Sequence, residues 1–509
     1  MCHSKSKTNL EQECKLITNS NKMRLMECYE IESVNELSNL LRDNWSNIAI
    51  INNHKKIIQV AAGSPPNILQ TIEYFDLSQI GHLYIESGAF RNMNSLKFLN
   101  ISHGKLNDLK SEWFTERNSV EVLNFSHNTL NNLTSTNLKN LKNIKEIDFS
   151  QNNLKSIQRG TFSSLRNLLI LNLDLNLLTE IDFGQVPKLK LLSINENLLT
   201  KLTSDTFIEM PQLESIFLVD NQLNEIEEET FKNLNRLKFL DLSSNQLHKI
   251  GTDIFKGLHK SKINIVDLSN NNIENIESGA FNGLQNLRKL DLSKNSIGKL
   301  RSSTFDGLDN LRRLSLGEND IETIQNFTFA SLQNLEILDI AANNLNSLET
   351  LIFGESLLNL RTLNISTNNL PNLNIEIFSP LTNLEYLKLH QNELTRIDSD
   401  LGLKLKKLKK LHIGHNHIEE LTSLTKFFHS FHYLPGRGIG LGTGLGLGLG
   451  RCGGLGFLFI GSAFAFGIAK ANAIAINRSN TVAEPDRESA RCRPPHRPRS
   501  IPCLSRPFV

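Results

Sequence analysis

Cysteine is scarce in this chain, with six residues among 509. Small secreted scaffolds held together by disulfides need a far higher cysteine density, so that class is excluded. An excess of charge of one sign is also missing, because 55 Lys and Arg face 53 Asp and Glu. Residues 431–509 hold ten of these basic and three of these acidic residues, which leaves a net charge of −5 on the rest. The main body is therefore not a nucleic-acid binder driven by bulk positive charge.

The two ends lack clear targeting segments. Residues 1–21 have no apolar stretch of about 7–15 residues, so they are not a secretory signal peptide; either the chain is cytosolic or its true start is missing. Residues 452–469 are 18 residues without charge, the lower limit for a membrane span, but they contain five Gly and lie between Arg451 and Lys470. Membrane association is left open. Because the composition changes abruptly at Pro435, we expect residues 436–509, first Gly/Leu-rich and then Pro/Arg-rich, to be disordered or misread sequence.

Between the ends, one pattern recurs in an Asn-rich sequence of 61 Asn, about 12% of the chain. The pattern is L-x-x-L-x-L-x-x-N-x-L, as in LKFLDLSSNQL from Leu237 and LRKLDLSKNSI from Leu287. Most of its Asn positions are 24 residues apart, and the shortest interval is 21 residues; they are 128, 152, 176, 197, 221, 245, 271, 295, 319, 343, 368, 392 and 416. Two weaker copies have Gly104 and Ile80 at this position. The period is that of a leucine-rich repeat.

Each residue type of the repeat has a physical role. The L-x-L segment predicts a short strand with alternate residues inward, and strands of successive turns stack in parallel. The amide of the Asn can satisfy backbone groups of its own and the adjacent turn. Ten residues beyond the Asn position a Phe recurs, which predicts a second apolar row under the convex side: Phe90, Phe114, Phe162, Phe207, Phe231, Phe255, Phe281, Phe305, Phe329, Phe353 and Phe378. The predicted fold is an α/β solenoid, a leucine-rich-repeat horseshoe with a parallel β-sheet on its concave face and mostly irregular convex segments.

The repeat resembles that of extracellular leucine-rich-repeat proteins of the 24-residue type, such as Toll-type receptor ectodomains, Slit and chaoptin-like adhesion proteins. The resemblance covers about residues 69–424 and implies a curved solenoid that binds a protein ligand through its concave sheet. It also implies that Cys14 and Cys28 form the disulfide of a reduced N-terminal cap; the alternative is two unrelated thiols. A Cys-rich C-terminal cap and a cytoplasmic signalling domain have no counterpart after Ile418, which puts Toll-like signalling in doubt.

Four regions follow from these patterns. Residues 1–47 are an N-terminal region with the Cys14–Cys28 cap, and residues 48–425 are the solenoid, with about 15–16 turns. Residues 426–435 are a short C-terminal cap, and residues 436–509 are the tail.

Two sets of surface residues are candidates for function. On the concave face, Phe217 and Val219 occupy sites where neighbouring turns carry Asp and Ser, and the position before the second Leu of the motif is apolar in nearby turns. We predict a partner-binding patch formed by Ile170, Leu191, Phe217, Val219, Phe239 and Ile265. The alternative is the ordinary tolerance of strands for such residues. The seven N-glycosylation motifs are about as many as chance gives for this composition, so they are no evidence of secretion. If the chain is secreted, Asn132 and Asn326 are the better acceptors because they should lie on loops, whereas Asn100, Asn124 and Asn364 fall on strands.

Catalysis finds no support in the motifs. The Gly/Leu-rich run does not follow a strand and has no lysine partner, so it is not a phosphate loop. His412, His415 and His417 lack a Cys or a consistently placed carboxylate to complete a metal site. We therefore predict no catalytic residue, no cofactor and no metal.

The favoured function is protein recognition at the cell surface or outside the cell, in adhesion or innate recognition. The partner is a protein ligand or receptor and not a nucleic acid, and the oligomeric state stays open. The rival is a cytosolic scaffold or regulatory subunit built on the same solenoid.

Overall fold

The computed structural model describes residues 14–18, 24–28, 47–52, 58–61, 70–355, 357–398 and 400–418. All of them belong to one structural unit, Met1–Ser462, and the second unit, Ala463–Val509, lies outside the described residues. The predicted cap at 426–435, the predicted tail and the candidate span at 452–469 also lie outside them. Among the described residues no helix is both long and apolar enough to span a bilayer.

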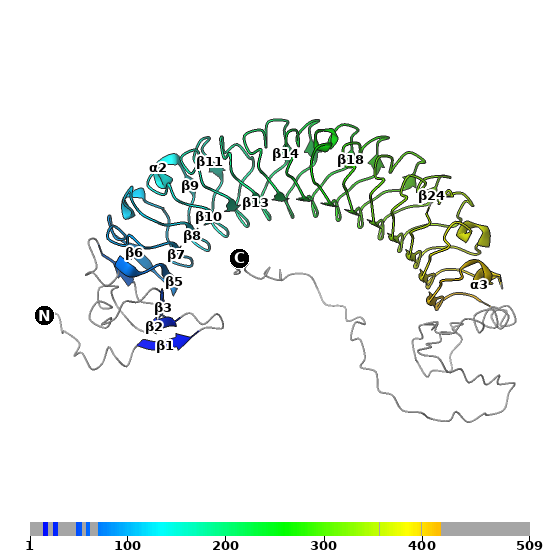
Figure 1. Cartoon of the computed structure of the whole chain (residues 1–509), viewed down its shortest axis with the longest axis horizontal. Coiled ribbons are helices and arrows are strands. Elements are labelled where there is room, and N and C mark those ends of the chain that lie inside the picture. The colour runs from blue at the N-terminus through cyan, green and yellow to red at the C-terminus, as the bar shows by residue number, and fades with distance from the viewer. Residues whose placement is uncertain are drawn as a thin grey trace, which may run out of the picture. The chain divides into compact units, whose positions relative to one another are not determined.

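One parallel sheet lines the inner side of the arc that the repeat turns follow (Figure 1). After β3 (Asn47–Asn52), each strand pairs in register with the strand of the next turn. These strands are β5 (Tyr74–Ile80), β7 (Phe98–Asn100), β8 (Val122–Asn124), β10 (Glu146–Asp148), β12 (Ile170–Asn172), β13 (Leu191–Ser193), β15 (Ser215–Phe217), β17 (Phe239–Asp241), β19 (Ile265–Asp267), β21 (Lys289–Asp291), β23 (Arg313–Ser315), β25 (Ile337–Asp339), β26 (Thr362–Asn364), β27 (Tyr386–Lys388) and β28 (Lys410–His412). The predicted horseshoe with a concave parallel sheet is confirmed.

The convex side consists mainly of turns, with short pieces of regular structure between them. Five pairs of parallel strands lie there among the described residues: β4 (Ile58–Val60) with β6 (Leu83–Ile85), β9 (Asn132–Leu133) with β11 (Ser156–Ile157), β14 (Lys201–Leu202) with β16 (Glu225–Ile226), β18 (Lys249–Ile250) with β20 (Asn275–Ile276), and β22 (Lys299–Leu300) with β24 (Thr323–Ile324). The helical pieces are η3 (Ser111–Trp113), α2 (Ser135–Leu138), η4 (Lys256–Leu258), η5 (Ile375–Phe378) and α3 (Leu401–Lys404). The prediction of mostly irregular convex segments holds.

A hairpin precedes the repeat turns. β1 (Cys14–Thr18) and β2 (Arg24–Cys28) pair antiparallel, and β2 runs parallel to β3. The register places Cys14 directly opposite Cys28. Opposed residues of antiparallel strands have Cα atoms about 4.5–5.5 Å apart, which lies within the span of a disulfide. The backbone is thus compatible with the predicted bond, which stays a prediction.

The repeated Asn residues form the predicted ladder, and all thirteen are buried. Asn152 is typical: its Nδ2 donates to the carbonyl of Phe125 in the preceding turn, at 3.1 Å, and to that of Phe149 in its own turn, at 3.0 Å. Its Oδ1 accepts from the backbone N–H of Leu130, at 3.0 Å. One buried amide therefore satisfies backbone groups of two turns, which would otherwise be costly to bury.

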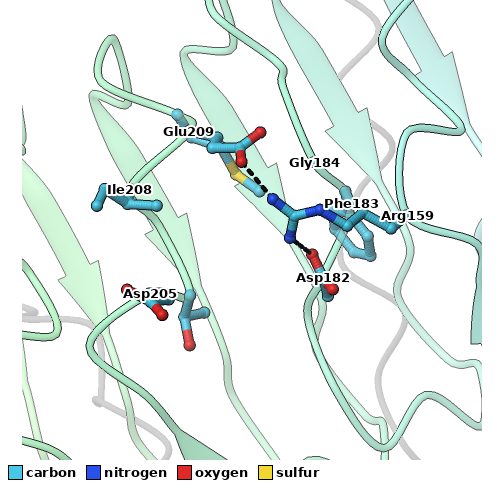
Figure 2. A pocket seen from close by; sticks show the side chains of 9 residues that line it. Arg159, Asp182, Phe183, Gly184, Asp205, Ile208 and Glu209 are labelled. Atoms are coloured by element: carbon cyan, nitrogen blue, oxygen red, sulfur yellow. Dashed lines mark hydrogen bonds and ion pairs between the residues drawn. The ribbon is translucent and has the colours of Figure 1, made fainter.

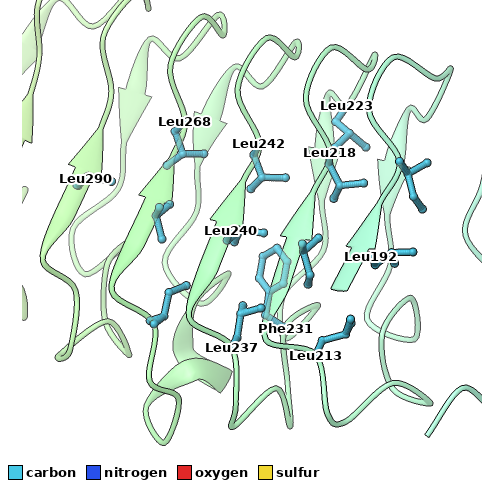
Figure 3. Close-up of a cluster of buried hydrophobic side chains, with 14 of the residues drawn as sticks. Leu192, Leu213, Leu218, Leu223, Phe231, Leu237, Leu240, Leu242, Leu268 and Leu290 are labelled. Carbon is cyan, nitrogen blue, oxygen red and sulfur yellow. The ribbon is translucent and has the colours of Figure 1, made fainter. Parts of the chain in front are cut away.

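The recurring Phe side chains form a row of rings under the convex side. From Phe207 to Phe353, seven rings follow one another with centroids 5.8–6.4 Å apart. The buried Leu residues of the repeat, such as Leu218, Leu242 and Leu268, recur along successive turns, and Phe231 of the Phe row lies in the same core (Figure 3). The predicted second apolar row is confirmed over these turns.

The shortest turn departs from the predicted spacing. It contains 21 residues from Asn176 to Asn197, and its aromatic residue is Phe183, seven residues after the Asn. Phe183 is buried and packs edge-on against Phe162, with centroids 5.5 Å apart. The ring row therefore continues through the short turn with a Phe that the ten-residue rule did not identify.

Candidate functional site

Five of the six predicted partner-binding residues lie on neighbouring strands of the concave sheet, from β12 to β19, and Val219 follows the end of β15. We call them the concave patch: Ile170, Leu191, Phe217, Val219, Phe239 and Ile265. Every one of them is half-buried. The central residue of each strand points into the core and is fully buried, so the flanking residues face the concave side.

Cross-strand neighbours group the residues of the concave patch. Ile170 lies beside Leu191, and Phe239 lies beside Ile265 in the sheet register. Ser215 separates Leu191 from Phe239 in that row. The ring of Phe217, on the same strand as Ser215, packs against that of Phe239, with centroids 4.9 Å apart.

Three further apolar residues on the same turns were missed from the sequence. Leu175, Leu177 and Leu198 lie just beyond the ends of β12 and β13 and are 36–37% exposed. A signal was present, because the positions of Leu177 and Leu198 hold polar residues in the other turns with the Asn motif, such as Gln222 and Gln246. The apolar surface of these two turns therefore extends from the sheet to the segments that follow β12 and β13.

Acidic side chains lie around the concave patch. Asp148 is one of them, and burial raises the pKa of four others, Glu146, Asp174, Glu196 and Asp241. Neighbouring carboxylates raise the pKa further, Asp148 acting on Glu146 and Asp267 acting on Asp241. Asp174 is held in place because its Oδ1 accepts from Ser193 Oγ at 2.7 Å and from the backbone N–H of Asn195 at 2.6 Å. The patch thus has an acidic, partly desolvated border.

The short turn opens a cleft of about 260 Å³ on the convex side (Figure 2). Arg159 reaches across it, and its two terminal nitrogens bond to Asp182 and Glu209. The nine lining residues include no Ser, Cys, His or Lys. We interpret the Arg159 fork as a strut that joins turns on either side of the short one.

The two predicted glycosylation residues have different surroundings. Asn132 is exposed, but it is the first residue of β9 and does not lie on a loop, so that part of the prediction was wrong. The reason is that a two-residue convex strand has no sequence periodicity that would reveal it. Asn326 lies in a turn, half-buried, and its Oδ1 accepts from the backbone N–H of Leu351 at 3.2 Å. Glycosylation of either residue stays a prediction.

Two histidines, His390 and His412, lie near each other in the last two described turns. His390 and His412 have ring centroids 6.4 Å apart, and burial lowers the pKa of both. Within the described part of the chain, no three His, Cys, Asp or Glu side chains gather in a way that could hold a metal ion.

Family models match most of the repeat region. A model described as leucine rich repeat matches residues 182–223, 211–263, 261–321, 309–357 and 358–418. A second, described as BspA type leucine rich repeat region, matches residues 70–183. A search of curated proteins found no match.

Solved structures share the fold. A leucine-rich-repeat protein of Leptospira interrogans is 25% identical, with a TM-score of 0.59 over 74% of this chain and 93% of that one. Toll in the Drosophila Toll–Spatzle complex is 20% identical, with a TM-score of 0.65 over 74% of this chain and 51% of the Toll chain. The glycosylated form of that complex gives 18% identity and a TM-score of 0.62, over 80% of this chain and 63% of that one. The stacked turns, the Asn ladder and these matches show that the chain is a leucine-rich-repeat protein, and so has a protein-interaction fold.

Proposed function

We propose that this protein is a non-catalytic recognition protein that binds another protein on its concave sheet, with the concave patch at the centre of the contact. The observation that supports this most is the patch itself. Phe217 and Val219 stand where most other turns carry Asp, Asn or Ser, and Ile170, Leu191, Phe239 and Ile265 add apolar side chains on neighbouring strands. Clustered aromatic and aliphatic side chains on a concave surface are the usual anchors of a protein interface.

The mechanism is presentation of a preformed surface. Each turn of the array is fixed to its neighbours by the ladder amides, the buried Leu residues and the Phe row. The patch therefore needs little ordering when a partner docks, and ordering costs are a main reason why buried area fails to give affinity. Toll, which shares the fold, was solved in a complex with the protein Spatzle. That structure gives a precedent for protein binding by such an array and does not name a partner here.

Capture from native extract tests this function. The full chain should retain a protein that is lost when Phe217 and Phe239 are both changed to Ser, because the two rings at 4.9 Å form the centre of the patch. The Phe327→Ser variant is the control, since Phe327 is 50% exposed on the convex side. All variants should keep the circular dichroism and melting of the parent. Equal retention by the parent and the double variant would contradict the proposal.

We further propose that the protein acts at the cell surface or outside the cell, in adhesion or innate recognition. This rests on the 24-residue period and its resemblance to secreted repeats. Peptide mapping of the endogenous protein from membrane, medium and cytosol fractions, with and without glycosidase, should find glycan on Asn132 or Asn326. Unmodified peptides confined to cytosol would instead support the intracellular scaffold.

A further inference from the structure

Carboxylates border the concave patch on two sides and also lie beside its central ring. We call them the carboxylate rim: Glu146, Asp148, Asp174, Glu196, Asp220 and Asp241. On the N-terminal side, Glu146 lies beside Ile170 in the sheet register. Asp241 lies beside Phe217 within the patch, whereas the neighbour of Ile265 on the C-terminal side is Lys289. Asp174, Glu196 and Asp220 lie where β12, β13 and β15 end, next to Val219 and the exposed Leu residues.

None of the six rim carboxylates forms an ion pair with another residue that the structure describes. This sets them apart from nearby acidic residues. Glu214, which precedes β15, lies 3.4 Å from Lys190 and 2.5 Å from Lys238. Asp267 and Asp291, one and two strands beyond Asp241, lie 3.9 and 3.5 Å from Lys289. The Lys side chains on this face therefore pair with Glu214, Asp267 and Asp291 and form no ion pair with the rim.

The pKa values of three rim carboxylates are raised, as expected for carboxylates that form no ion pair. The pKa of Glu196 is raised by burial and by the charges of Asp220 and Asp174, and that of Glu146 by burial and by Asp148. For Asp241, burial raises the pKa, and the Ser243 hydrogen bonds and the more distant Lys289 offset it only partly. For Glu146 and Glu196 no neighbouring cation offsets the rise in pKa.

We propose that the carboxylate rim selects the partner: the concave patch receives a protein segment whose apolar side chains are flanked by Lys or Arg. This inference rests on the proposed function and adds the charge of the ligand to it. Covering unpaired carboxylates with an uncharged partner would remove their water without replacement, which is costly. A cationic rim on the partner would instead pair with them, and it would also speed association.

Three fluorescent peptides of about ten residues provide the probe, a length that crosses five strands at about 4.8 Å spacing when extended. They share alternating Phe and Ile and differ in carrying Lys, Gln or Glu at every other position. With the full chain, we expect the Lys peptide to bind about tenfold more tightly than the Gln peptide, and the Glu peptide to bind most weakly. The advantage of Lys should shrink between about 50 and about 500 mM NaCl, because salt screens exposed charges.

Matched variants locate the effect. Glu146→Gln/Glu196→Gln removes two rim charges from side chains for which the structure shows no hydrogen bond, and it should weaken the Lys peptide about threefold to tenfold while sparing the Gln peptide. Asp306→Asn/Asp309→Asn removes two exposed charges elsewhere and should change neither. Phe217→Ser should weaken both peptides. Since burial raises the pKa of Glu146, Asp174, Glu196 and Asp241, the advantage of Lys should also decline as pH falls, and at a higher pH than ordinary carboxylates would give.

The outcomes separate the two proposals. If the Lys and Gln peptides bind equally and both depend on Phe217, the rim does not select the ligand and the proposed function stands. If the Asp306/Asp309 variant weakens the Lys peptide as much as the Glu146/Glu196 variant, only overall charge matters and the inference is wrong. Binding of the Lys peptide that is unchanged by Phe217→Ser would contradict the patch and the proposed function with it.

Discussion

Replacing Phe281 with Ala should lower the free energy of unfolding by about 4 kcal/mol, near the upper part of the range for buried aromatic residues. Phe281 is completely buried in the Phe row, with its ring centroid 6.4 Å from that of Phe255 and 6.1 Å from that of Phe305. Loss of the ring removes both stacking contacts and leaves a cavity between two turns that have fixed backbones. Urea denaturation followed by circular dichroism measures the loss.

The position of Phe281 makes a second effect measurable. In a repeat array each turn is stabilised mainly by its neighbours, so a cavity between turns weakens the coupling of the two halves. The slope of the unfolding transition should therefore decrease in Phe281→Ala, since each half would expose less surface in its own transition. The control is Phe327→Ala, at a ring that is 50% exposed, for which we expect a loss below about 1 kcal/mol. Equal losses in the two variants would contradict the structural role of the Phe row.

Replacing Asn343 with Ala should cost about 3 kcal/mol, because it leaves several buried backbone groups without partners. The Nδ2 of Asn343 donates to the carbonyls of Leu316 and Ile340, at 3.0 and 3.1 Å, and its Oδ1 accepts from the N–H of Ile321 at 3.0 Å. Ala is too small to replace these bonds, and the site is buried in the solenoid.

The adjacent residue is a matched control for the Asn ladder. Asn344 is exposed, and the same change to Ala there should alter stability by less than about 0.5 kcal/mol. Differential scanning calorimetry of the full chain compares the two variants directly. If Asn343→Ala and Asn344→Ala melt at the same temperature, the buried amide does not contribute the stability that its hydrogen bonds suggest.

The regular part of the fold could be predicted because the same constraints recur in every turn. Leu218 and Leu242 occupy equivalent positions and are buried for the same reason, and the Asn between such residues always faces the same two backbones. One strong copy of the motif therefore predicts the others. Phe183 escaped prediction because its turn is three residues shorter than the 24-residue period, so its spacing from the Asn no longer matches.

The candidate site was predictable only in part. Phe217 and Phe239 could be assigned to the concave face from the alternation of the strands, but their ring contact depends on the stagger between neighbouring turns. The unpaired state of Glu146 and Asp241 was not predictable either. It depends on how far Lys side chains of other turns reach, as the two bonds of Glu214 to Lys190 and Lys238 show. Cross-turn geometry of this kind is absent from a one-dimensional pattern.

In the proposed recognition, the array of turns fixes the strands in place and the concave patch provides the contact surface. Turns held by the ladder and the Phe row keep β12 to β19 in a fixed register, so six side chains from five strands act as one surface. A rigid surface gains affinity from few anchors, because little entropy is lost on binding. This predicts that binding energy concentrates at the two central rings and is small at the margin of the patch.

The most direct measurement is the affinity of the captured partner, by calorimetry, for the parent chain, Phe217→Ala and Phe327→Ala. We expect Phe217→Ala to weaken binding about 30-fold, the effect of losing a hot-spot residue worth about 2 kcal/mol, with unchanged melting. Phe327→Ala, on the convex side, should bind as the parent does. An unchanged affinity in Phe217→Ala, or a larger loss in Phe327→Ala, would show that the partner does not bind at the concave patch.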